Sequence, residues 1–194
     1  MKTKVAFLAS GAGSSARAIV EAARAGVLDI EPVLLVANSR KAAALEWAHD
    51  LGLRTACIPT VGDPDEADRA LADALVRSGA EVVVLSGYLR RLGPQVLTRF
   101  DRRILNVHPG PLPEFGGEGM YGRRVHEAVL ASGRAETEIV IHLVDEEYDH
   151  GPEVARRAIR IDPDDTAEAL EARVKAAEPA FFVETLGRWL YRPS

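Results

Sequence analysis

The stretch KVAFLASGAGSSARAIVEAARAG, residues 4–26, decides the fold. It opens with a nearly continuous apolar run, passes through a glycine-rich turn and continues with apolar residues at helical spacing. A strand that is apolar at almost every position is typical of a sheet buried on both faces, and parallel sheets are of this kind. The stretch therefore predicts a buried strand followed directly by a helix, the first half of a βαβ unit.

The rest of the chain repeats this alternation. Further strands are expected at 32–39, 55–59, 81–87, 103–109 and 138–145, and helices at 40–52, 65–79 and 123–133. The last third predicts a strand over 153–162 with charge on one side, then a long helix over 165–191 with Asp164 or Thr166 as its N-cap. The expected fold class is α/β: an open, mainly parallel Rossmann-like sheet with helices on both faces, an antiparallel strand near the C-terminus and a long C-terminal helix. We expect residues 1–194 to form a single domain.

Composition narrows the class of protein. The chain has 194 residues, a formal net charge of -5 and 47% hydrophobic residues. An acidic balance argues against a nucleic-acid partner, and no apolar stretch approaches the roughly 20 residues that span a membrane. The amino end reads as a first strand rather than a signal peptide. The single cysteine, Cys57, fits a reducing compartment and is expected as a small buried strand residue, so a cytoplasmic location is predicted.

The glycine-rich turn SGAGSSA is a candidate anion site. The backbone amides of Gly13, Ser14 and Ser15 stand at the start of the first helix, where a helix N-terminus holds phosphate well. The same residues weakly match a dinucleotide fingerprint, with Arg40 after the second strand favouring NADP. A tight turn with no ligand is the third interpretation, and the turn alone does not choose among them.

The stretch NVHP, residues 106–109, places an amide and an imidazole at the end of a strand. Asn106 donates through its amide, a protonated His108 donates with positive charge, and a nearby carboxylate keeps that ring charged or oriented. Asp149 in VDEEYDHG is the chosen carboxylate, because the glycine that follows closely indicates a shaped loop. Such a set suits acyl transfer, in which a tetrahedral oxyanion must be stabilised. By residue type alone, His108 could instead cap a strand, and the acidic run could face solvent.

Other sites are less favoured by the pattern. A metal site made by His108, His142, His150 and nearby acids lacks any recognised ligand spacing. His142 lies within an apolar strand and is expected to be a core histidine. His126 and His49 lie on helices, where face or surface positions are expected. No G-x-S-x-G elbow marks a nucleophilic serine.

Several motifs together resemble the folate-dependent formyltransferases over nearly the whole chain. They are SGAGSS, VVVLSGYLRRLGP, ILNVHPGPLPEFGGEGMYG, VHEAVL, IHLVDEEYDHGP and ARVKAAE. The resemblance implies transfer of a formyl group from 10-formyltetrahydrofolate, as co-substrate, to the amine of glycinamide ribonucleotide in purine biosynthesis. Asn106 and His108 would then hold the formyl oxygen, and Asp149 would assist. No metal is expected.

The resemblance also implies where the substrates bind. The residues implied for the substrate phosphate and nucleotide are Gly11, Gly13, Ser14, Ser15 and Glu178. The residues implied for folate are Leu89, Arg90, Leu92, Glu146, Glu147 and Tyr148.

Two competitors stay open near this family, and two more come from other classes. A formyltetrahydrofolate deformylase passes the formyl group to water, and a sugar-nucleotide formyltransferase uses another amine. From other classes, a non-catalytic binding module or an NADP oxidoreductase leaves Asn106, His108 and Asp149 together unexplained. The predicted partners are small molecules, with neither nucleic acid nor membrane, and the chain is expected to be a monomer or homodimer.

Overall fold

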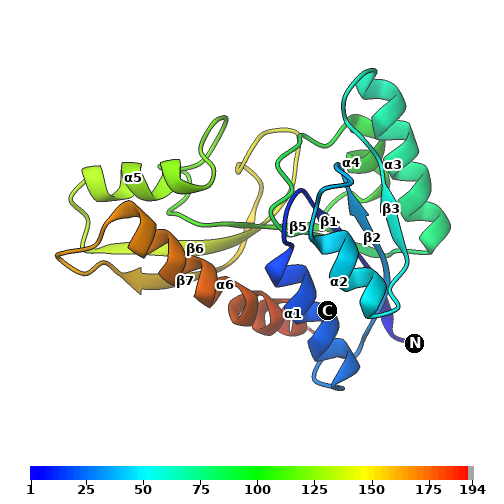
Figure 1. Cartoon of the computed structure of the whole chain (residues 1–194), viewed down its shortest axis with the longest axis horizontal. Helices are drawn as coiled ribbons and strands as arrows, with labels where there is room; N and C mark the ends of the chain where they lie inside the picture. Colours follow the sequence, from blue (N-terminus) through cyan, green and yellow to red (C-terminus); the bar gives the residue numbers. More distant parts are fainter. Residues whose placement is uncertain (192–194) are drawn as a thin grey trace. The chain divides into compact units, whose positions relative to one another are not determined.

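The computed structural model describes residues 1–191 and contains one seven-stranded sheet in the order β3-β2-β1-β4-β5-β6-β7. The strands are β1 (Thr3–Ala9), β2 (Ile30–Ala37), β3 (Thr55–Cys57), β4 (Val82–Leu85), β5 (Ile104–His108), β6 (Glu136–Leu143) and β7 (Glu153–Arg160). The helices are α1 (Ser14–Arg24), α2 (Ala44–Asp50), α3 (Pro64–Ser78), α4 (Pro94–Arg99), α5 (Arg123–Ala131) and α6 (Ala167–Leu190). Figure 1 shows the alternation of strands and helices along the chain. The predicted fold class is confirmed.

The chain forms two compact units, and their boundary lies inside β5. The first runs from Met1 to Leu105 and the second starts at Asn106. The expectation of a single domain stays a prediction.

In the first unit, the strands are parallel and their buried residues are apolar. β1 pairs with β2 on one side and β4 on the other, β2 pairs with β3, and β4 pairs with the start of β5. The side chains from Val5 to Ala9 are completely buried, as expected for a central strand covered on both faces. Cys57 lies on β3 as predicted, but it is only half-buried because β3 is an edge strand.

Helices cover both faces of these strands because each parallel connection must cross over in the same hand. The connections β1-α1-β2 and β2-α2-β3 move along the sheet in one direction, and the return to β4 through α3 moves in the other. Accordingly α1 contacts α2, and α3 contacts α4 (Figure 1). The N-cap of α3 is Asp63, whose carboxylate accepts hydrogen bonds from the Asp65 and Glu66 amides.

The short helix α4 has no counterpart among the predicted elements. Its six residues are too few to produce a helical period, and its N-cap, Gly93, makes no side-chain capping bond. The cap comes from another helix: the buried carboxylate of Asp68 on α3 accepts from the amides of Gln95 (2.8 Å) and Val96 (3.2 Å). A contact between residues 27 positions apart is invisible to local pattern.

The second unit is built on an antiparallel pair. β6 pairs with β7 in antiparallel register. From Ala155 to Arg160, β7 alternates between half-buried and exposed residues. Arg156 and Arg160 are exposed, but Arg157 is half-buried, so the charge is not confined to one side as predicted. α6 packs against β6, β7 and α5. The observed helix lies within the predicted range, and its N-cap is Thr166, whose hydroxyl accepts from the Ala169 amide at 3.1 Å.

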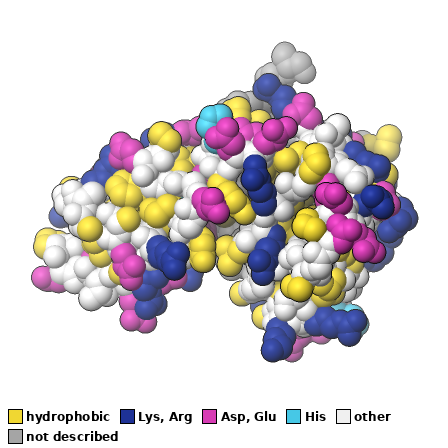
Figure 2. Space-filling model, turned by 90° about the horizontal axis from the view of Figure 1, so that it is seen from above, with side chains coloured by type: hydrophobic (Ala, Val, Ile, Leu, Met, Phe, Trp, Pro, Cys, Tyr) yellow, Lys and Arg dark blue, Asp and Glu magenta, His cyan; other side chains and the backbone are white. Residues whose placement is uncertain are grey.

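The surface in Figure 2 carries Lys and Arg interspersed with Asp and Glu rather than gathered in one basic area. Within residues 1–191, no helix combines the length and apolar character that a membrane crossing requires.

Replacing Asp68 should lower the free energy of unfolding. Asp68→Ala leaves the Gln95 and Val96 amides without their acceptor in a buried setting, so we expect a loss of about 1–3 kcal/mol by urea denaturation. Asp68→Asn keeps one acceptor oxygen and should lose less. Asp65→Ala, at an exposed position of the same helix, is the control. Equal stabilities of Asp68→Ala and Asp65→Ala would contradict the capping role.

Candidate active site

Asn106 and His108 lie at the carboxyl end of β5, in the second unit. Alternate residues of a strand point to the same face, so both side chains project the same way. Asp149 lies in the loop between β6 and β7, 41 residues after His108 in sequence. The structure brings this loop back against β5, where the Asp149 carboxylate meets the His108 ring.

The His108 ring is 3% exposed and has an acceptor on each side. Its Nδ1 lies 3.3 Å from Asp149 Oδ2, and its Nε2 lies 2.7 Å from the carbonyl oxygen of Phe115. A neutral imidazole has only one N–H, whereas the imidazolium has two. The doubly protonated ring therefore satisfies both contacts.

Asp149 is held in an unusual backbone conformation by its side-chain contacts. Its φ is 56°, in the left-handed region, which aspartate tolerates better than most residues. Its Oδ2 also accepts from the Gly117 amide at 3.1 Å, and its Oδ1 lies 3.4 Å from His142 Nε2. Burial alone would raise the pKa of Asp149, but the hydrogen bond from His108 and that from the Gly117 amide hold it well below its usual range. Asp149 is thus a carboxylate at neutral pH.

Gly151 shapes the loop that carries Asp149. A Cβ atom at this position would lie 1.9 Å from the Leu143 carbonyl oxygen. Because glycine has no side chain, the chain after β6 can fold back closely enough to bring Asp149 to His108.

His142 is the site residue whose contacts the pattern did not predict. It is 2% exposed, as expected for a core histidine, yet its Nε2 lies 3.2 Å from Asn106 Nδ2. Its Nδ1 lies 2.9 Å from the Leu143 carbonyl oxygen. The available signal was its position near the end of a strand, directly before the loop of Asp149.

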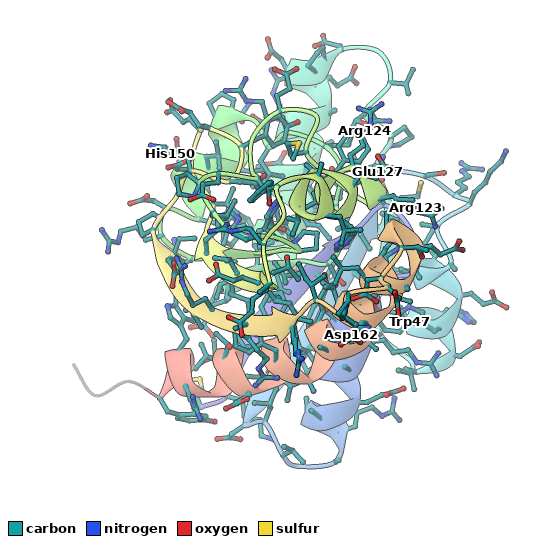
Figure 3. All side chains as sticks on the ribbon, turned by 90° about the vertical axis from the view of Figure 1, so that its left-hand side faces the viewer. Trp47, Arg123, Arg124, Glu127, His150 and Asp162 are labelled. Carbon is teal, nitrogen blue, oxygen red and sulfur yellow. The ribbon has the colours of Figure 1, made fainter. Side chains whose placement is uncertain are left out.

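The remaining histidines, His49, His126 and His150, take no part in these contacts. His126 is buried on α5 rather than on the surface, and burial lowers its pKa against the opposing effect of Glu171. His49 is exposed, as is His150, labelled in Figure 3. A hydrogen bond with Asp145 raises the pKa of His150.

The glycine-rich turn in the first unit joins β1 to α1. Gly13 has a φ of 63°, and a Cβ there would lie 3.2 Å from the Ala44 Cβ, so glycine is required. The carbonyl oxygens of Gly11 and Ala12 accept from the Ala44 amide (3.0 Å) and the Trp47 ring (2.8 Å). Figure 3 labels Trp47. The first N–H groups of a helix have no acceptor within it, which is the reason for expecting an anion here, and that role stays a prediction.

The two serines after Gly13 differ in exposure. Ser14 is exposed, whereas the Ser15 side chain is buried inside the first unit. Only the backbone of Ser15 can therefore take the role expected for it. The Ala16 amide is already bound to the Ser86 hydroxyl at 3.1 Å.

The segment after β4 carries the residues expected to contact folate. The Leu89 side chain is exposed, and its amide donates to the Ser10 hydroxyl at 2.9 Å. Arg90 is exposed and Leu92 is buried, so Leu92 can offer a ligand only its backbone. Burial raises the pKa of the neighbouring Tyr88 to about 12, against the opposing charge of Arg90.

In the second unit, the expected folate residues lie on the exposed side of the β6–β7 loop. Glu146, Glu147 and Tyr148 are all exposed, and the Glu147 amide donates to the Asp145 carboxylate at 2.9 Å. On α6, Glu178 is half-buried, and burial raises its pKa to about 7 despite the nearby charge of Lys175. About two turns earlier, Glu171 binds Lys175 at 2.6 Å and Arg123 at 2.9 Å. Arg123 is labelled in Figure 3.

Among the residues that the structure describes, no group of three or more His, Cys, Asp or Glu side chains could hold a metal ion.

A family model described as formyl transferase matches residues 3–186. The chain belongs to this family. The match covers both units and all the motifs on which the resemblance was based, so the family prediction is confirmed.

The relatives carry a more specific name. Phosphoribosylglycinamide formyltransferase from Bacillus subtilis is 31% identical over 96% of this chain and 94% of its own length. The chloroplastic protein of that name from Arabidopsis thaliana is 38% identical over 96% of this chain, which spans 65% of that relative. The crystal structure of phosphoribosylglycinamide formyltransferase from Bacillus halodurans matches with a TM-score of 0.90 and 30% identity, covering 98% of this chain and 96% of the other.

Asp149 should contribute stability that depends on pH. Because its pKa is lowered on folding, the contribution is fully present above the unfolded-state value of about 4 and is lost as the pH falls further. Asp149→Asn keeps the shape and tolerates the left-handed backbone, and should lower the unfolding free energy by about 2 kcal/mol at pH 7.

Urea titrations between pH 3 and 7 check this expectation. The difference between wild type and Asp149→Asn should shrink as the pH falls below about 4. Asp145→Asn, in the same loop, is the matched control. A difference that is constant with pH would contradict the ion pair with His108.

Proposed function

We propose that this protein transfers the formyl group of 10-formyltetrahydrofolate to the amine of glycinamide ribonucleotide, a step of purine biosynthesis. The observation that carries the proposal is the buried contact of His108 with Asp149, next to Asn106, in a chain of the formyl transferase family. The names of the relatives support the choice of acceptor.

In the proposed reaction, the amine nitrogen attacks the formyl carbon, and the carbonyl oxygen becomes an oxyanion. The Asn106 amide and the His108 imidazolium donate to that oxygen, and their attraction grows as its charge develops. His108 Nε2 lies 2.7 Å from the Phe115 carbonyl oxygen, to which the imidazolium donates. The formyl oxygen must replace that carbonyl as the acceptor, so substrate binding requires a local shift of residues 110–117.

The proton balance closes through Asp149. A new bond joins the amine nitrogen to the formyl carbon, and the bond from that carbon to N10 of the folate breaks. The attacking amine loses a proton and N10 gains one. We propose that a water molecule held by the Asp149 carboxylate carries this proton, while the same carboxylate keeps His108 charged.

Binding roles follow from the resemblance and from the local geometry. Amides of the turn from Gly11 to Ser15 would hold the substrate phosphate, and Glu178 would accept from ribose hydroxyls. The residues for folate would be Leu89, Arg90, Leu92, Glu146, Glu147 and Tyr148. The number of copies in solution, one or two, and the cytoplasmic location stay predictions.

Acceptor dependence separates the competing functions. Purified protein is given 10-formyltetrahydrofolate with or without glycinamide ribonucleotide, and both tetrahydrofolate and formylated product are measured. Tetrahydrofolate release that requires the ribonucleotide supports the proposal. Equal release of tetrahydrofolate without the ribonucleotide indicates a deformylase. If no tetrahydrofolate is released, sugar nucleotides are the next acceptors to test. A change in NADPH fluorescence on adding protein would instead support the oxidoreductase.

Removing a donor to the oxyanion should reduce turnover strongly. His108→Ala and Asn106→Ala should each lower kcat by about 100- to 1000-fold, since one oxyanion donor contributes this much in comparable sites. His150→Ala, an exposed histidine of the same unit, is the control and should keep wild-type turnover. Circular dichroism checks folding. Turnover near the wild-type value in His108→Ala would refute its role.

The affinity for the ribonucleotide should depend on the protonation of Glu178. Its pKa of about 7 means that the carboxylate, which accepts two hydroxyl hydrogen bonds, is lost as the pH falls below that value. The KM for glycinamide ribonucleotide should therefore rise between pH 7.5 and 6. In Glu178→Gln, KM should be high, and it should change less over this range than in the wild type, because only the titration of the substrate phosphate remains. Glu184→Gln on the same helix is the control, and an equal change of KM with pH in the wild type and in Glu178→Gln would contradict this role.

A further inference from the structure

We propose that His142 is a positioning residue that holds the amide of Asn106 with its N–H facing the reacting oxygen. The inference rests on the proposed function for its effect on catalysis, but its structural content is independent of the acceptor. Neither the family motif nor the names of the relatives assigns this histidine a role.

The two nitrogens of His142 have different partners. Nδ1 lies 2.9 Å from the Leu143 carbonyl oxygen, which can only accept, so Nδ1 carries the proton. In the neutral ring, Nε2 is then a bare acceptor. Asn106 Nδ2 lies 3.2 Å from it, within hydrogen-bond distance, and donates to it.

The contact of Nε2 with Asp149 is of a different kind. Asp149 Oδ1 lies 3.4 Å away, at ion-pair distance but beyond the range of ordinary N–H···O bonds. The carboxylate has its own donors in His108 and the Gly117 amide. Nε2 of His142 is thus left to Asn106.

An amide side chain needs such a partner to be useful at an oxyanion. Asn106 can present either an N–H or a carbonyl oxygen by turning its amide through 180°, and only the N–H stabilises negative charge. A bare Nε2 binds one hydrogen of the NH2 group and repels the amide oxygen. The second hydrogen of the same NH2 group then remains for the formyl oxygen, already oriented before the substrate arrives.

A merely structural histidine would not account for this arrangement. His142 is completely enclosed and is already bound to Leu143, so an apolar ring would fill the same volume. The hydrogen bond that Asn106 donates is what a phenyl ring cannot replace.

A double-mutant cycle tests whether His142 acts through Asn106. The variants are His142→Phe, His142→Gln, Asn106→Ala and the double variant Asn106→Ala/His142→Phe. His142→Phe should lower kcat about 10- to 100-fold with little change in KM, less than the loss of the donor itself. His142→Gln, which offers an amide oxygen to Asn106, should recover part of that loss. The double variant should be no slower than Asn106→Ala alone.

Independent losses that multiply in the double variant would overturn the inference, as would wild-type kcat in His142→Phe. A structural role predicts multiplied losses and a lower unfolding free energy, with no recovery in His142→Gln. Absence of any transfer by the wild type to glycinamide ribonucleotide would be a failure of the proposed function and not of this inference.

Nuclear magnetic resonance of the wild type gives an answer that needs neither activity nor a variant. In protein labelled with 15N, we expect a scalar coupling across the hydrogen bond between Asn106 Nδ2 and His142 Nε2. The Nε2 shift should be that of an unprotonated nitrogen, and the Nδ1 shift that of a protonated one. A protonated Nε2 without coupling to Asn106 would overturn the inference.

Discussion

The interaction on which the site depends is the buried contact between Asp149 and His108. Both side chains are at most 10% exposed, so each charge would be costly without the other. The contact compensates for the left-handed backbone of Asp149 and for the close approach of Gly151 to Leu143. The Asp149 carboxylate also accepts a hydrogen bond from the Gly117 amide, and this bond links the loop after β5 to the loop after β6. Loss of this one carboxylate would therefore leave both the His108 Nδ1 and the Gly117 amide without their acceptor.

In this fold, the strands supply the packed core, and the strand ends and loops carry the polar residues of the candidate sites. Strands β1, β2, β4 and β5 bury apolar residues on both faces, which leaves little room for function within the sheet. Polar groups appear where strands end, because there the backbone turns out of the packed layers. Asn106 and His108 are at the last positions of β5, and the glycine-rich turn directly follows β1. Within each unit, the buried apolar residues of a strand fix its position, and they therefore also fix the position of the polar residues at its end.

Histidine serves three different ends in the second unit because its surroundings differ. His108 has two acceptors and is satisfied as a cation. His142 has one acceptor and one donor, which a neutral ring satisfies. His150 is exposed beside Asp145, where an ion pair contributes little. The same residue type therefore gives no indication of role until its partners are known.

The sequence by itself determined the order of strands and helices apart from α4, the parallel character of the first half and the family. These depend on short-range patterns: continuous apolar runs, helical spacing, and motifs such as GAGSS and NVHP that are readable along the chain. It also singled out Asn106, His108 and Asp149 by residue type, although their roles remain proposals. What only the tertiary structure decided are contacts between distant positions. The cap of α4 by Asp68, the enclosure of His126 and the bond between His142 and Asn106 each join residues that no local pattern relates. Such contacts form only when helices and strands pack together. The sequence pattern of a strand indicates that a residue is buried, but it does not indicate which residue it contacts.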